Sequence, residues 1–230
     1  MAKHSRPAGK GFLVFIRDLL VIVVIAFVIS FGLKTFLVRA FYIPSGSMLE
    51  TLKVDDRILV NQLVPTTMSV NRGDIVVFKD PGGWVHPQAF PESSGVKSFL
   101  EKIGLAAEVT DEYVVKRVIG VGGDNVTCCD ANGLVEVNEV PIREPYIKLP
   151  EGVTKVSEME FDVEVPKGSV WVMGDNRYSS KDSRYNQDQP GRGFVSEEEI
   201  VGRAVIINWP LSHIEILGNH PEVFAGIEDR

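Results

Sequence analysis

Residues 113–119 read Tyr-Val-Val-Lys-Arg-Val-Ile, and their side chains alternate with the two-residue period of a β-strand. Lys116 lies between Val114 and Val118 on one face of this strand, and Arg117 lies on the other face. Burial of an unpaired ammonium group is costly, and desolvation lowers the pKa of such a lysine. Lys116 is therefore either a candidate general base or an edge lysine whose amine reaches solvent.

Similar β-branched runs recur along the chain and are separated by Gly, Pro, Asn and Asp. They occupy residues 57–61, 74–79, 134–137, 169–173 and 200–209. Several short strands at this spacing predict a mostly β fold, with antiparallel sheets in a partly closed, barrel-like domain.

One segment departs from this strand pattern. Residues 80–91 are rich in Pro and Gly, and residues 95–107 carry apolar side chains at a helical spacing. We therefore expect a loop-plus-helix excursion at 80–112. No linker divides residues 39–230, so they are expected to form one domain.

The N-terminal part of the chain contains a long apolar segment, residues 12–38, interrupted by Arg17, Asp18 and Lys34. Its longest uninterrupted part, residues 19–33, would extend roughly 22 Å as a helix, less than a ~30 Å hydrocarbon core. The flanking turns complete the span if the Lys34 amine reaches the interface. The segment predicts one N-terminal transmembrane helix.

Charge predicts the orientation of this helix. Residues 1–11 are basic, so we expect them in the cytoplasm and residues 39–230 outside the cell membrane. A cleaved secretory signal is the alternative, but residues 38–40, Val-Arg-Ala, form a poor small-x-small cleavage site.

The composition excludes some classes of protein. With 44% hydrophobic and 24% charged residues, the 230-residue chain is not disordered. The net charge is −7, and residues 41–230 alone carry −12, which argues against nucleic-acid binding. The two cysteines, Cys128 and Cys129, are adjacent; they are either incidental structural residues or a vicinal redox pair.

Residues 43–48, Ile-Pro-Ser-Gly-Ser-Met, form a predicted tight turn just beyond the apolar segment. Pro44 fixes one φ angle, and Gly46 permits a positive one. Ser45 and Ser47 are two residues apart, so one hydroxyl could act as a nucleophile and the other could face an oxyanion. The turn could equally be a polar juxtamembrane loop.

A second polar segment follows the predicted strand 169–173. Residues 173–184 read Met-Gly-Asp-Asn-Arg-Tyr-Ser-Ser-Lys-Asp-Ser-Arg, with a turn at the Gly-Asp-Asn sequence. Asp182 and Arg184 could form an ion pair. The density of charges and hydroxyls favours a functional segment over a solvated hairpin loop.

Taken in order, the apolar anchor, PSGSM, YVVKR and GDNRYSSKDSR resemble bacterial type I signal peptidases, which are membrane-bound endopeptidases with a Ser/Lys dyad. The resemblance implies that Ser47 is the nucleophile and Lys116 the general base. The Ser45 hydroxyl and the Ser47 backbone N–H would form the oxyanion hole. Ser180 would hydrogen-bond the lysine amine and orient it.

The resemblance also implies two structural ion pairs, Asp182 with Arg184 and Arg117 with Asp175. Glu50 departs from the family pattern, in which a proline is common at this position. The implied substrates are exported preproteins, cleaved after small-x-small sites at the lipid bilayer, and the implied chemistry needs no metal or cofactor.

Three alternatives remain open. An inactive paralogue would share the composition, but it would be expected to lose Ser47 or Lys116, and both residues are present. Another Ser/Lys hydrolase, such as the self-cleaving domain of LexA-type repressors, would share the dyad but lack an anchor. A membrane-anchored β-domain that only binds a partner would share the fold and leave the serines and lysine without a catalytic role.

Overall fold

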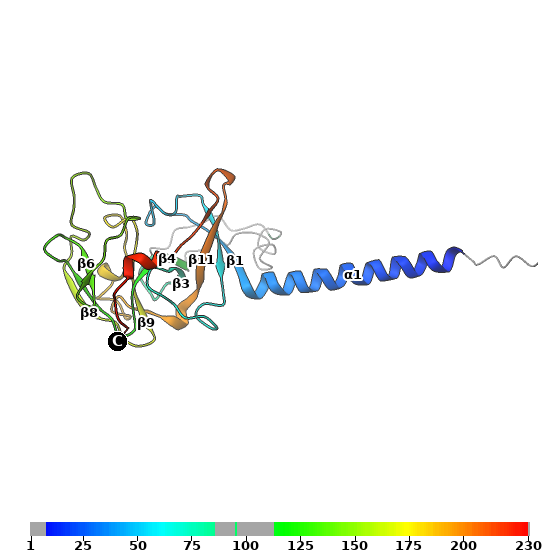
Figure 1. Ribbon diagram of the computed structural model, residues 1–230, viewed down its shortest axis with the longest axis horizontal. Coiled ribbons are helices and arrows are strands. Elements are labelled where there is room, and N and C mark those ends of the chain that lie inside the picture. The colour runs from blue at the N-terminus through cyan, green and yellow to red at the C-terminus, as the bar shows by residue number, and fades with distance from the viewer. Residues whose placement is uncertain (1–7, 86–94, 96–112, 230) are drawn as a thin grey trace, which may run out of the picture.

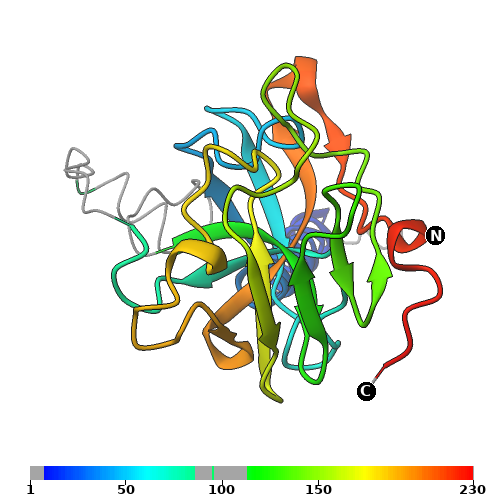
Figure 2. The ribbon, with the colours of Figure 1, turned by 90° about the vertical axis from the view of Figure 1, so that its left-hand side faces the viewer.

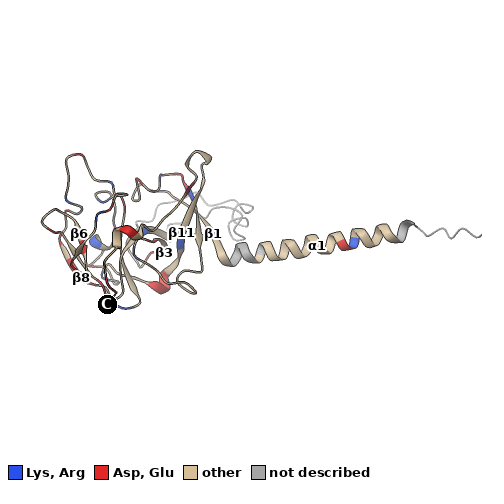
Figure 3. Cartoon of the chain, viewed as in Figure 1, with Lys and Arg blue, Asp and Glu red and all other residues tan. Residues whose placement is uncertain are grey.

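The computed structural model describes residues 8–85, 95 and 113–229, so most of the expected excursion at 80–112 lies outside the described residues. Helix α1 (Ala8–Leu37) projects away from the β-rich body (Figure 1). Within it, Gly11–Ser30 has a mean hydropathy of 2.9 and is not buried against the body. By length and composition this stretch could cross a membrane. Figure 3 shows how few charges the described part of the helix carries.

The larger sheet contains eight strands, and every pairing in it is antiparallel. Its order is β1 (Val38–Tyr42), β2 (Arg57–Asn61), β11 (Ile200–Trp209), β3 (Ile75–Lys79), β4 (Tyr113–Val121), β9 (Ser169–Met173) and β10 (Val195–Ser196), with β12 (Glu215–Ile216) paired to β11. Strands β1 and β10 end the order, so the described strands do not form a closed barrel. The predicted mostly β, antiparallel class is confirmed.

The smaller sheet lies beside the larger one (Figure 2). Its order is β7 (Val140–Pro141), β6 (Val135–Val137), β5 (Asn125–Cys128) and β8 (Phe161–Glu164). Only β6 corresponds to a strand expected from the sequence. A disulfide joins Cys128 at the end of β5 to Cys129. Four short 3-10 helices complete the described chain: η1 (Ser183–Tyr185), η2 (Glu197–Glu199), η3 (Leu211–His213) and η4 (Pro221–Phe224).

Strands β3 and β4 lie in the middle of the larger sheet, and apolar side chains cover both of its faces there. Residues 75–78 are therefore all buried, as a continuous apolar run requires. In the register of these two strands, Val76 lies opposite Lys116. The central position of β4 explains why Lys116 is only 4% exposed although it is a lysine.

Candidate active site

The turn that carries Ser47 follows β1 and is held by the backbone of a neighbouring loop. The Ile43 N–H donates to the Asp56 carbonyl at 2.9 Å, and the Asp55 N–H donates to the Ile43 carbonyl at 3.0 Å. The Leu52 N–H donates to the Met48 carbonyl at 2.7 Å. These bonds fix both ends of the turn while leaving Ser47 partly exposed.

The end of strand β9 packs directly against this turn. The backbone N–H of Asn176 donates to the Ser47 carbonyl at 3.0 Å, and Asn176 Nδ2 donates to the Gly46 carbonyl at 2.9 Å. Gly174 allows this approach, because a Cβ atom there would lie 2.6 Å from the Ser47 carbonyl oxygen and 2.2 Å from Ser180 Oγ. The segments around residues 47 and 175 thus form one contact.

Lys116 reaches the same turn from β4. Its Nζ donates hydrogen bonds of 2.9 Å to Ser47 Oγ and 2.9 Å to the Val115 carbonyl. Burial lowers the pKa of Lys116 from 10.5 to about 8, although the charges of Asp182 and Asp175 partly oppose that shift. A substantial fraction of this lysine is therefore neutral in mildly alkaline solution.

Three fully buried ion pairs each include at least one residue of the segment 175–184 that follows β9. Arg117 and Asp175 are joined at 2.7 Å, Arg184 and Asp182 at 2.8 Å, and Arg177 and Glu144 at 2.6 Å. Each arginine thus has its own carboxylate, and no described carboxylate forms an ion pair with Lys116. The three arginines and three carboxylates cancel one another, so the buried charge is balanced when Lys116 is neutral. This balance agrees with the lowered pKa of Lys116.

The Asp182 pair also fixes backbone near Ser47. Asp182 accepts hydrogen bonds from the Arg184 guanidinium and from the Gly174 N–H at 2.9 Å. Burial opposes ionisation of Asp182, but the charge and hydrogen bonds of Arg184 outweigh burial and lower the pKa of this carboxyl. Asp182 therefore stays anionic while it holds the end of β9 in place.

The other two expected site residues also lie close to Ser47. Ser45 is exposed, and its Oγ lies 3.4 Å from Ser47 Oγ. Ser180 is buried, and its Oγ has no hydrogen-bond partner among the described residues. The expected bond between Ser180 and the lysine amine is therefore not formed in this structure.

The sequence motifs predict no role for two residues at the site. Asn176 lies in the predicted Gly-Asp-Asn turn, and its contact with residue 46 spans 130 positions. Glu144 lies outside every quoted motif, yet it forms the buried pair with Arg177 and accepts a hydrogen bond from Tyr146. No local pattern could have identified either contact.

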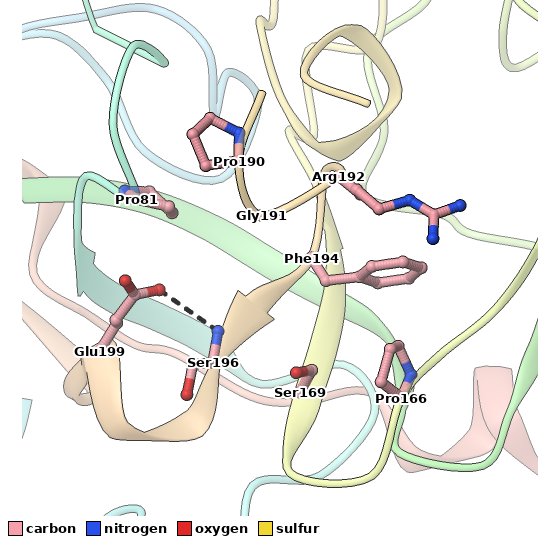
Figure 4. A pocket seen from close by; sticks show the side chains of 9 residues that line it. All are labelled: Pro81, Pro166, Ser169, Pro190, Gly191, Arg192, Phe194, Ser196 and Glu199. Carbon is pink, nitrogen blue, oxygen red and sulfur yellow. Dashed lines mark hydrogen bonds between the residues drawn. The ribbon is translucent and has the colours of Figure 1, made fainter. Parts of the chain in front are cut away.

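A separate pocket of about 400 Å³ lies elsewhere and contains none of the expected site residues (Figure 4). Pro81, Pro190 and Phe194 form part of its wall. Glu199, which also lines the pocket, accepts a 3.3 Å hydrogen bond from the Ser196 N–H, and Ser196 is the N-cap residue of helix η2. Among the described residues, no group of three or more His, Cys, Asp or Glu side chains could hold a metal ion.

The sequence matches the family model described as "Signal peptidase, peptidase S26" over residues 16–209. The chain belongs to this family. It is 37% identical to a signal peptidase I of Mycobacterium tuberculosis, over 91% of this chain and 76% of the relative. It is 34% identical to signal peptidase I of Leptolyngbya laminosa, over 84% of this chain and 80% of the relative.

A third relative, signal peptidase I U of Bacillus subtilis, is 34% identical over 80% of this chain and 82% of its own length. These matches confirm the resemblance that the ordered motifs indicated, and they assign the chain as a signal peptidase I-type hydrolase. The matched region of the S26 model includes both Ser47 and Lys116.

Proposed function

We propose that this protein is a membrane-anchored serine endopeptidase that removes N-terminal signal peptides from exported preproteins. The observation that best supports this proposal is the 2.9 Å hydrogen bond between the buried Lys116 amine and Ser47 Oγ. A serine hydroxyl needs an adjacent base to become a nucleophile, and a lysine with a pKa of about 8 can serve as that base.

The first step forms an acyl-enzyme. Neutral Lys116 keeps two N–H groups, one of which bonds the Val115 carbonyl, and its lone pair accepts the Ser47 hydroxyl proton. Ser47 Oγ attacks the carbonyl carbon of the last signal-peptide residue and forms a tetrahedral oxyanion. When the intermediate collapses, the C–N bond breaks and Lys116 returns the proton to the leaving amine.

The Ser45 hydroxyl and the Ser47 backbone N–H donate hydrogen bonds to the oxyanion. Each such donor is worth a factor of about 10²–10³ in rate. Lys116 then takes a proton from water as the water attacks the acyl carbonyl. The proton passes to Ser47 Oγ, which regenerates the enzyme and releases the signal peptide.

We propose that helix α1 spans the cell membrane, with residues 1–11 in the cytoplasm and residues 39–230 outside, and so keeps this chemistry beside the substrate. A signal peptide that emerges from the bilayer would then present its small residues at positions −1 and −3 close to the Ser47 turn.

Cleavage of a purified preprotein by the full-length protein in lipid vesicles tests this proposal. The wild type should cut after a small-x-small site, while Ser47→Ala and Lys116→Met should each lose at least about 10³-fold in rate. Ser212→Ala and Lys79→Met, at exposed positions, are the matched controls. An inactive wild type, or normal cleavage by either site variant, would favour a membrane-anchored binding domain instead.

A further inference from the structure

Asn176 forms two hydrogen bonds to consecutive carbonyl groups of the Ser47 turn. Its backbone N–H donates to the Ser47 carbonyl at 3.0 Å, and its side-chain Nδ2 donates to the Gly46 carbonyl at 2.9 Å. The Gly46 carbonyl accepts one further, longer bond of 3.3 Å from the Leu49 N–H. The side-chain bond is thus the shorter of the two that hold the Gly46 carbonyl.

The Gly46 carbonyl shares a peptide plane with the Ser47 N–H. This peptide bond is trans, so its C=O and N–H groups point in opposite directions. A bond that fixes the direction of the Gly46 carbonyl therefore fixes the direction of the Ser47 N–H. Among the described residues, no acceptor takes a hydrogen bond from the Ser47 N–H.

We infer that Asn176 is a positioning residue that aims the Ser47 backbone N–H at the oxyanion through its bond to the Gly46 carbonyl. The same bond polarises the peptide group, which makes its N–H a stronger donor. This inference rests on the proposed function, because it assumes that Ser47 is the nucleophile.

The geometry separates this role from a general role in folding. Replacement of the Asn176 side chain removes only the bond to Gly46, because the bond to the Ser47 carbonyl comes from the Asn176 backbone. The turn therefore stays docked on β9 while one peptide plane loses its restraint. Lys116 is untouched, so the pH midpoint of activity should not move.

Asn176→Ala and Asn176→Asp test the inference in the full-length protein in detergent. The aspartate keeps the size of the side chain but presents an oxygen to the Gly46 carbonyl, so it removes the same bond. Asn138→Ala is the matched control, because Asn138 is a buried asparagine whose Nδ2 donates to Asp124 and to the Glu228 carbonyl.

The informative probe is a peptide boronic acid that ends in alanine, compared with the same peptide as an unreactive amide. Ser47 Oγ adds to boron while its proton passes to Lys116, and the tetrahedral adduct places an oxygen where the oxyanion forms. Both Asn176 variants should lose at least about tenfold in kcat and in boronate affinity. In both variants KM and amide affinity should change less than about twofold. In Asn176→Ala, which adds no charge beside Lys116, the pH midpoint should stay at the wild-type value.

Three results would overturn the inference while wild-type cleavage stands. Both variants could keep wild-type kcat and boronate affinity, they could change KM alone, or their loss of kcat could follow a loss of folded protein measured by thermal unfolding. A wild type whose Ser47 forms no boronate adduct would instead reject the proposed function itself. Asn138→Ala should keep normal kcat and boronate affinity despite reduced stability.

Discussion

Lys116 Nζ donates a 2.9 Å hydrogen bond to Ser47 Oγ across 69 positions of the chain, and the lysine is only 4% exposed. The contact joins the central strand β4 to the turn after β1. The packing that holds the amine against the hydroxyl also buries Lys116, and this burial lowers the pKa of the lysine.

Activity should depend on pH through the neutral form of Lys116. Because its pKa is lowered to about 8, kcat/KM should rise with pH up to about 8 and then level off. Below that value it should fall close to tenfold per pH unit, since protonated lysine cannot accept the serine proton. A profile that stays flat between about pH 6 and 9 would contradict a lysine base.

Asp182→Asn should shift this profile toward acid. The negative charge of Asp182 raises the pKa of Lys116, so its removal lowers that pKa further. The change also leaves Arg184 as an unpaired buried charge, which should cost about 3–5 kcal/mol of stability. Kinetic pH profiles and urea unfolding would measure the two effects, with the exposed Asp188→Asn as a control.

Lys116→Met should stabilise the folded state near neutral pH. The pKa of Lys116 is about 8 in the folded protein and 10.5 without burial, so the unfolded chain binds this proton more readily. The resulting loss of stability is complete below pH 8 and disappears as the pH rises to 10.5. At pH 7 the gain should approach about 3 kcal/mol, at 1.36 kcal/mol per pKa unit.

Urea unfolding of both proteins at several pH values would measure this gain. The two free energies of unfolding should converge above pH 10.5. A Lys116→Met variant that is less stable than the wild type at pH 7 would show that the buried, protonated lysine does not destabilise the folded state.

Gly174→Ala should abolish most activity. The added Cβ would lie 2.2 Å from Ser180 Oγ and 2.6 Å from the Ser47 carbonyl oxygen, so the turn or the end of β9 must move. Displacement of a nucleophile by about 1 Å can cost about 10²-fold in rate. Gly218→Ala, where a Cβ would meet no atom within 4 Å, should keep full kcat in the same assay.

The sequence identified the strand and the lysine because alternation along residues 113–119 needs only local information. The smaller sheet was largely missed because its strands are two to four residues long and too short to show a clear period. The contacts of Asn176 and Glu144 were missed for a different reason. They join segments far apart in the chain, so only the packed fold brings them together.

Trapping the acyl-enzyme tests the central claim most directly. The full-length protein in detergent would be treated at pH 8 with an acylating peptide ester that ends in alanine, and the modified residue located by mass spectrometry. We expect one adduct, on Ser47, absent from Ser47→Ala and formed far more slowly by Lys116→Met. An adduct on another residue, or wild-type acylation by Lys116→Met, would contradict the Ser47–Lys116 dyad.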